Sequence, residues 1–389
     1  MSNCQIKRAA GFSLLEMTIA LALGAIVLAA AVQIYIQGLN ATWIATQRAE
    51  MQENFRAASN ILTKDLGLAG AGLGPTVAIP LPSSTAPVYG CDQTKTCYLN
   101  GTSVSYPEQG TTRYLYGLLP GYDDGPTLLT AQGPTDIITV VYTDPILYLD
   151  CYTATAASAT TATFVLPSST SSNCTAPSGT TPQAVNDAAQ GLTAGDLVLF
   201  YFGTTPVVAE VTGAVTSSTS GSVTTYTVPF AASDVLNMNQ GTTVKYSLAY
   251  QYTSGSVKTG YANRIEVITY YIDNTVSPPR LMRQISGHSP VAVAEDLAYL
   301  KFTYNLFNTA TTTLAVGCTN PGAATDGCTP SGASSGMLPN QVTQINIQNM
   351  AIDSSLQSAL YGLANGYQRL DLQTSVCPRN LTYVNDYNN

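Results

Sequence analysis

Residues 1–36 read MSNCQIKRAAGFSLLEMTIALALGAIVLAAAVQIYI, and this stretch decides the fold class. Residues 12–36 are apolar except at four positions. These are Ser13, Glu16, Thr18 and Gln33. A run of this length meets the requirement of about 20 residues for a helix that spans a bilayer. Because Lys7 and Arg8 precede it, the positive-inside rule predicts that residues 1–11 stay in the cytoplasm and that the remainder is exported.

An ordinary secretory signal is the alternative interpretation of this segment. It would have a shorter apolar region followed by a small-residue cleavage site. Residues 29–31 (AAA) could serve as that site, but helix-forming sequence continues through them. Glu16 argues against a plain signal or anchor, because an intramembrane carboxylate costs roughly 2.5–3.5 kcal/mol on insertion scales and normally marks a function.

Residues 11–18 read GFSLLEMT and resemble the class III signal of type IV prepilins and type II secretion pseudopilins. The resemblance rests on the order of a basic leader, Gly11, Phe12, a glutamate at the fifth position of the mature chain and an apolar run. It implies that a prepilin peptidase cuts after Gly11, removes residues 1–11 and methylates the new amine of Phe12. It also implies assembly at an inner-membrane platform with other pilins of a filament, through a contact between Glu16 and the Phe12 amine of a neighbouring subunit. An ion pair within one subunit is the alternative.

The helix is expected to continue beyond the membrane, because apolar residues recur at spacings of three, four and eight. They are Leu39, Trp43, Met51, Phe55, Ala58, Leu62 and Leu66. Gly67 and the Gly/Pro-rich residues 70–75 predict its end. We therefore predict a helix over residues 12–66, about 80 Å long at 1.5 Å per residue. Its membrane or filament-core half is residues 12–36, its amphipathic half is residues 37–66, and Gly38 is a candidate flexible point.

Residues 67–389 are predicted to form an antiparallel β-rich domain. Several segments are rich in Val, Ile, Tyr, Phe and Thr, and some alternate with a period of two. These segments are residues 136–143, 196–203, 244–253, 264–272, 297–307, 341–352 and 368–376. Residues 153–187 and 213–225 are rich in Ser, Thr and Gly and are expected to be long loops. The predicted fold class is α+β and type IV pilin-like: a long N-terminal helix, transmembrane in its first half, packed on a large β-rich domain.

The eight cysteines indicate the compartment. Cys4 lies in the leader, and six others fall in close pairs within polar sequence. The pairs are Cys91 with Cys97, Cys151 with Cys174, and Cys318 with Cys328. Since no C-x-x-C motif or nearby histidine supports a metal site, we expect disulfides in an oxidising space outside the inner membrane. Cys377 is left over, so either one pairing is wrong or this thiol is free.

Charge argues against nucleic acid as the default partner. Charged residues make up only 10% of the chain. After loss of Lys7 and Arg8, the 15 Lys and Arg fall to 13 against 23 Asp and Glu, a formal charge of −10. Phosphate binding depends on clustered Lys and Arg, and such a surface gives it little support.

Enzymatic motifs are weak, and neither an enzyme nor a cofactor is expected. Residues 332–336 match G-x-S-x-G, but they lie in a Cys/Pro/Gly loop rather than between a strand and a helix. Residues 123–125 (DDG) are a candidate calcium site or a solvated turn. Arg280, Arg283 and His288 form a small basic cluster, which a strand with charged outward positions would explain.

Tyrosine is plentiful, at 24 residues. Tyr250, Tyr252, Tyr270 and Tyr271 are expected in strands, where they would pack across the sheet or bind a glycan or partner subunit.

Further short segments of the sequence resemble segments of PilW-type minor pilins. They are residues 52–54, 65–66, 69–70, 295–297, 300–304 and 338–342. The resemblance implies a minor pilin of the initiation or tip complex, anchored in the inner membrane as a precursor and later exposed on the pilus. A J-type minor pseudopilin of a type II secretion system is the alternative. A further hypothesis is an adhesin that acts through residues 75–235.

Overall fold

The structure is a computed structural model that describes residues 13–74, 78–99, 101–167, 172–255, 257–308, 311–322, 328–329, 336–354 and 368–381. The chain divides into two compact units. The first comprises Met1–Glu53 with Ser354–Gln368, and the second comprises Asn54–Asp353 with Arg369–Asn389.

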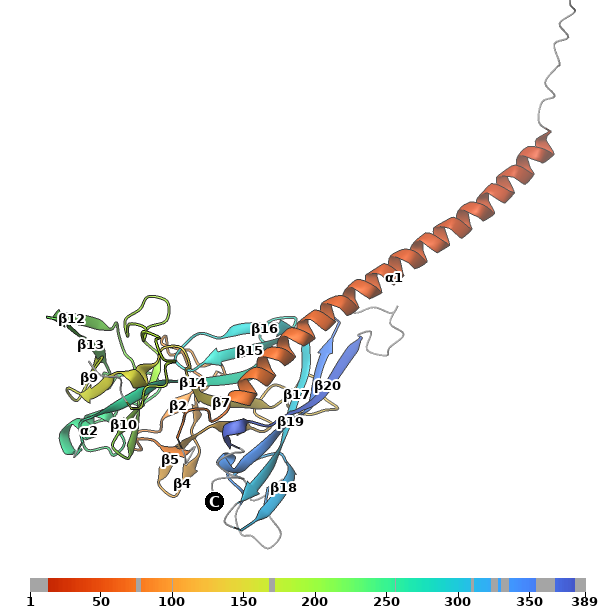
Figure 1. Ribbon diagram of the computed structural model, residues 1–389. Helices are drawn as coiled ribbons and strands as arrows, with labels where there is room; N and C mark the ends of the chain where they lie inside the picture. Colours follow the sequence, from red (N-terminus) through yellow and green to blue (C-terminus); the bar gives the residue numbers. More distant parts are fainter. Residues whose placement is uncertain are drawn as a thin grey trace, which may run out of the picture. The chain divides into compact units, whose positions relative to one another are not determined.

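Helix α1 (Leu14–Leu68) has 55 residues and is the long helical ribbon in Figure 1. In the first unit its residues 14–39 are exposed or nearly so, and large apolar side chains such as Leu14 and Ile34 are 84% and 71% exposed. Among the described residues, α1 is the one helix long and apolar enough to cross a membrane. It is continuous through Gly38, where we expected a flexible point.

The C-terminal end of α1 belongs to the second unit and is buried there. Ala58, Leu62 and Leu66 recur every four residues and are fully buried, which gives this part of the helix one apolar face. The helix ends at Leu68, two residues beyond the predicted end. The chain then turns at Gly70 and Gly72, both with positive φ. A side chain at Gly72 would also bring Cβ to 1.9 Å from the Thr143 hydroxyl, so only glycine fits there.

Over the part of the chain that the structure describes, the largest sheet has eleven strands and is antiparallel. Its strands are β6 (Leu118–Gly121), β7 (Ile137–Thr143), β8 (Thr153–Ala156), β9 (Thr161–Val165), β10 (Leu197–Phe202), β11 (Thr205–Glu210), β12 (Thr216–Ser220), β13 (Val223–Pro229), β14 (Thr259–Asp273), β15 (Arg280–Ile285) and β16 (Val291–Glu295). Strand β14 organises the sheet, because its first half pairs with β8 and β10 and its second half pairs with β7 and β15.

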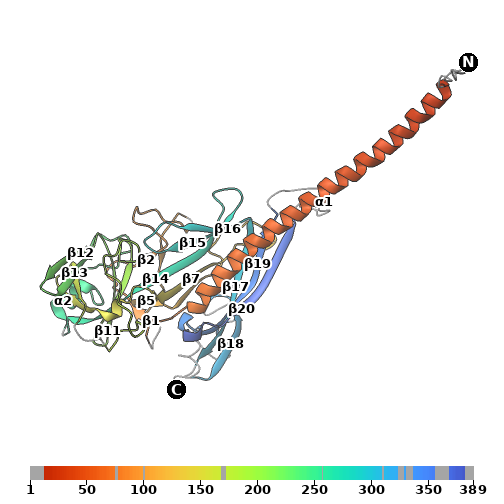
Figure 2. The same cartoon turned by 45° about the horizontal axis from the view of Figure 1, so that its top comes forward.

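Strands β17 (Leu297–Asn308), β18 (Thr313–Cys318), β19 (Val342–Asp353) and β20 (Arg369–Val376) form a sheet in the order β18-β17-β19-β20. Within the second unit, these strands lie at the opposite end from the β12–β13 hairpin in both views (Figures 1 and 2). Two smaller sheets contain β1 (Ala78–Pro80), β5 (Thr112–Tyr116) and β4 (Glu108–Gln109), and β2 (Val88–Tyr89) with β3 (Val104–Ser105). The predicted class is confirmed: a long apolar N-terminal helix is followed by a large antiparallel β-rich domain.

The strand predicted over residues 244–253 is wrong. Helix α2 (Leu248–Ser254) occupies most of this segment. Ser247 caps it, because its hydroxyl accepts a hydrogen bond from the Tyr250 amide at 3.1 Å. Tyr250 and Tyr252 therefore lie on a helix, whereas Tyr270 and Tyr271 lie in β14 as predicted.

The two predicted loops also contain regular structure. Residues 153–187 include the β8–β9 hairpin, and residues 213–225 include β12 and the start of β13. Polar composition concealed these strands because their hydroxyl residues occupy exposed positions. The Thr219 and Thr224 hydroxyls, for example, lie 3.0 Å apart across the β12–β13 hairpin. The Phe164 side chain of β9 is fully buried.

Candidate functional site

The first turn of α1 is closed by a reciprocal pair of hydrogen bonds. The Glu16 Oε2 atom accepts from the Ser13 amide at 3.0 Å and from the Ser13 hydroxyl at 3.2 Å. In return, the Glu16 amide donates to the Ser13 Oγ atom at 3.2 Å. This arrangement is a capping box, which satisfies amides that the helix itself leaves free. Gly11 and Phe12 lie outside the described residues.

The position of Glu16 gives it two different chemical capacities. Its carboxylate caps the helix, and it lies at the start of a long apolar surface. A free amine brought to that surface would need a counter-charge, since lipid or a protein core solvates ions poorly. Glu16 is the acidic residue of the first turn and can supply that charge.

A second polar group lies at the other end of α1, within the second unit. The Asp65 Oδ2 atom accepts from the Arg283 Nε at 2.8 Å and from the Tyr270 hydroxyl at 2.6 Å. The Tyr142 hydroxyl lies 3.3 Å from Asp65 Oδ1, and Glu266 lies 3.7 Å from the Arg283 guanidinium. Burial, together with the charge of Asp65, holds the pKa of Tyr270 well above its usual range. These groups fix the end of the helix to β7, β14 and β15.

The basic cluster expected at Arg280, Arg283 and His288 is not a basic surface. Each side chain lies beside a carboxylate: Arg280 contacts Glu295 at 3.1 Å, and His288 contacts Asp196 at 2.8 Å. The strand explanation was correct for Arg280. It was wrong for Arg283, which is directed toward Asp65, and for His288, which lies beyond the end of β15.

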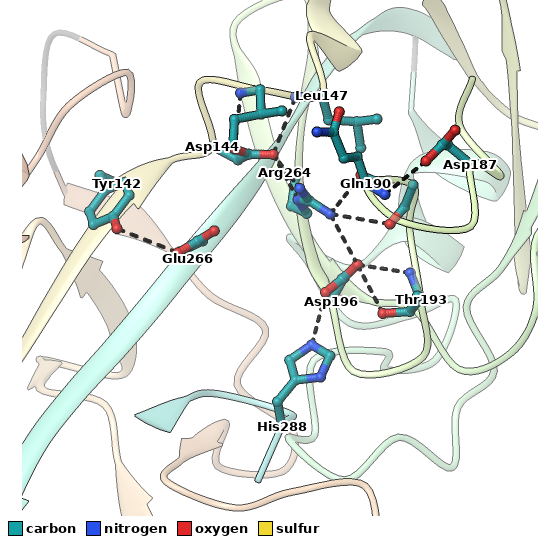
Figure 3. Close-up of polar contacts among 12 residues, drawn as sticks. Tyr142, Asp144, Leu147, Asp187, Gln190, Thr193, Asp196, Arg264, Glu266 and His288 are labelled. Carbon is teal, nitrogen blue, oxygen red and sulfur yellow. Dashed lines mark hydrogen bonds and ion pairs between the residues drawn. The ribbon is translucent and has the colours of Figure 1, made fainter. Parts of the chain in front are cut away.

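Arg264 of β14 is the centre of a third polar cluster (Figure 3). Its Nε donates to Asp144 at 2.9 Å, and its Nη1 donates to the carbonyl oxygens of Gln190 and Gly191 at 3.1 and 3.2 Å. Asp196 lies 3.6 Å from the same guanidinium. The cluster holds two loops against one strand. Sequence reasoning missed it, because its members are separated by up to 120 residues and no local motif connects them.

The hydrolase motif gains no support from these contacts. His288 bonds the Asp196 carboxylate, and Ser334, the central serine of the motif at residues 332–336, lies outside the described residues.

At the candidate calcium site of residues 123–125, the ammonium group of Lys301 contacts carboxylate groups. Lys301 contacts the Asp123 carboxylate, and its Nζ lies 2.6 Å from the Asp136 Oδ1 atom. The Asp123 amide donates to Asp136 at 2.9 Å. Among the described residues there is no group of three or more His, Cys, Asp or Glu side chains arranged to hold a metal ion.

Among the described residues, six cysteines form three disulfides. They are Cys91–Cys97, Cys151–Cys174 and Cys318–Cys328. Cys377 is an exposed free thiol. Each disulfide closes a loop of the second unit.

Comparison with known proteins places one signal at the N-terminus. Residues 6–32 match the family described as the prokaryotic N-terminal methylation motif. No curated protein matches the chain. Among solved structures, the chain is similar to a type IV-like pilin, TTHA1219 from Thermus thermophilus, at 12% identity. That match covers 49% of this chain and 87% of the other with a TM-score of 0.16, which is too low to support an argument.

Proposed function

We propose that the chain is a structural subunit of the type IV pilin class, cleaved after Gly11 by a prepilin peptidase and assembled through α1. The observation that carries the proposal is the methylation motif at residues 6–32, which includes most of the exposed apolar half of α1. A single helix with that surface is stable in lipid or against other helices, because either removes the apolar side chains from water.

Within this class, we propose a minor pilin of the initiation or tip complex. About 320 residues follow α1, which corresponds to a radius of gyration near 20 Å for a compact domain. Such a bulky domain fits a tip more readily than a closely repeated shaft. The local resemblance to PilW-type minor pilins supports the same assignment. A minor pseudopilin of a type II secretion system uses the same helix and processing, and it is the alternative.

Processing is tested by mass spectrometry of the N-terminus. The mature chain should begin at an N-methylated Phe12. Gly11→Val should block cleavage, because it adds a branched side chain beside the scissile bond, and the precursor should accumulate in the inner membrane. Ala9→Val is the matched control in the leader and should be cleaved. A mature N-terminus near Ala30 would overturn the proposal in favour of an ordinary secretory signal.

Position in the filament is tested by quantitative mass spectrometry of sheared filaments. A minor subunit should be present at a small fraction of the main shaft subunit. Comparable abundance would contradict the tip assignment, and co-purification with secretion-system components instead of pili would favour the pseudopilin alternative.

A further inference from the structure

A pocket of about 520 Å³ opens within the second unit, and no part of the proposed assembly mechanism uses it. Its walls come from residues 143–150, from the segment on both sides of Cys174, from Gly72 after α1, and from the start of β14. The volume lies within the range of roughly 300–1,000 Å³ typical of small-molecule sites.

Covalent and polar contacts hold the pocket walls in place. The Cys151–Cys174 disulfide joins two of the contributing segments. Next to it, the Asp150 carboxylate accepts a hydrogen bond from the Thr175 amide at 2.9 Å. Arg264 secures Asp144, which also lines the pocket (Figure 3). The site is therefore formed before a ligand arrives, which lowers the ordering cost of binding.

Two tyrosines give the pocket aromatic surface. Tyr261 stacks on Tyr201 with ring centroids 5.0 Å apart, and the Tyr201 hydroxyl donates to the Leu73 carbonyl at 2.7 Å. Tyr148 has φ of 50°, a left-handed conformation that a residue with a bulky side chain rarely adopts. Such strain persists only where the surrounding structure enforces it, and it is concentrated at functional sites.

Polar groups complete the lining. Asp150 is 98% buried, with 2% of its surface exposed, and its carboxylate can accept several hydrogen bonds beyond that from Thr175. The neighbouring Cys151 sulfur is in a disulfide and has no proton to donate. Asn263 of β14 is half-buried and offers two amide donors and one carbonyl acceptor.

We propose that this pocket binds a neutral saccharide. A sugar presents hydroxyl donors and acceptors around its edge and apolar C–H groups on its faces. The carboxylate of Asp150 and the amide of Asn263 match the hydroxyls, and Tyr148 and Tyr261 match the C–H face. An anionic ligand is disfavoured because the buried Asp150 carboxylate would repel it. The pocket gives the adhesive hypothesis a defined location.

The test uses the full processed chain in lipid nanodiscs. A glycan array identifies a ligand, and saturation-transfer NMR with neutral disaccharides (lactose, maltose, cellobiose and N,N′-diacetylchitobiose) measures binding. Sialyllactose and choline chloride are the anionic and cationic comparators. At least one neutral saccharide should bind, with its C–H protons saturated.

Two substitutions should weaken that binding at least tenfold: Asn263→Ala and Tyr148→Ala. Their controls are Asn186→Ala, an exposed asparagine elsewhere, and Tyr246→Ala, another tyrosine with positive φ. Thermal unfolding verifies that each variant is folded. The proposal is overturned if no neutral saccharide binds at millimolar concentration, if only sialyllactose or choline binds, or if folded pocket variants bind like the controls. Filament assembly does not enter these measurements, so their failure leaves the pilin assignment intact.

Discussion

The Asp65 carboxylate of α1 lies 2.8 Å from the Arg283 guanidinium of β15. An acidic side chain in the last turn of a helix is unfavourable, because the helix dipole places partial negative charge there. Asp65 is also 95% buried, with 5% of its side chain exposed, so its charge depends on protein partners. Arg283 and the Tyr270 hydroxyl provide them. The pair thereby fixes the end of the helix in one position on the sheet.

Asp65→Asn should lower the free energy of unfolding by about 2–4 kcal/mol, because it leaves the partly buried Arg283 without its principal counter-charge. Urea unfolding of the full chain in detergent measures the effect. The matched control is Glu295→Gln, which removes the exposed partner of Arg280 and should cost less than about 1 kcal/mol. Equal effects for the two variants would show that burial of the Asp65 pair has no special consequence.

The sequence predicted individual helices and strands better than the side-chain contacts between them. The apolar run and the four-residue spacing of Ala58, Leu62 and Leu66 predict α1, because helix periodicity is a local property. The segment of residues 244–253 was misassigned because capping by Ser247 outweighed its β-forming composition. The contacts of Asp65 with Arg283 join residues 218 apart, and no local pattern indicates which distant side chains will meet.

Glu210, the last residue of β11, gives the fold a pH dependence. Its side chain is fully buried, accepts from the Leu236 amide at 2.8 Å and contacts the Gln93 amide group. Burial, with a further contribution from the charge of Asp234, raises the pKa of Glu210 to about 7 from 4.5. Between these pH values the folded state retains a proton that the unfolded state has released. The contribution of Glu210 to the free energy of unfolding should therefore be largest near and below pH 4.5. It should fall as the pH rises to about 7.

This loss should amount to roughly 1–3 kcal/mol. Thermal unfolding of the wild-type chain and Glu210→Gln between pH 5 and 8 measures it. The glutamine is neutral throughout and retains an oxygen acceptor. The variant should therefore lose the pH dependence that Glu210 causes, and it should be more stable relative to the wild-type chain at pH 8 than at pH 5. If the stability of the two proteins changed with pH in the same way, the assignment of this pH dependence to Glu210 would be contradicted. Asp371→Asn, at an exposed position of β20, is the control and should leave the curve unchanged.

The three disulfides should be recovered by non-reducing peptide mapping of the exported chain. Each should contribute roughly 2–4 kcal/mol by restricting the unfolded state. Cys377 should react with a thiol reagent before reduction, because it is exposed and unpaired in the structure. A peptide that joins Cys377 to Cys318 or Cys328 would show that the neighbour pairing fails in that region. Cys377→Ser is the control and should leave the other three linkages unchanged.

Glu16 allows helix capping to be separated from assembly. Glu16→Gln removes the negative charge but retains an oxygen that can accept from the Ser13 amide, so the capping box should persist. If the carboxylate neutralises the Phe12 amine of an adjacent subunit, this variant leaves a buried ammonium unpaired, at a cost of about 3–5 kcal/mol. Processing should continue, because the scissile bond lies on the leader side of Phe12, whereas incorporation into filaments should fall sharply.

Ser13→Ala is the matched control for Glu16→Gln. It removes the hydroxyl that caps the Glu16 amide at 3.2 Å but keeps the carboxylate. Loss of a cap costs about 1 kcal/mol of helix stability, and a helix this long tolerates that loss. Ser13→Ala should therefore assemble while Glu16→Gln does not. The measurements are the mature N-terminus by mass spectrometry and the fraction of each subunit in sheared filaments. Normal incorporation of Glu16→Gln would leave the capping contact with Ser13 as the function of this carboxylate. Loss of assembly in both variants would instead indicate that filament growth depends on the order of the first helical turn.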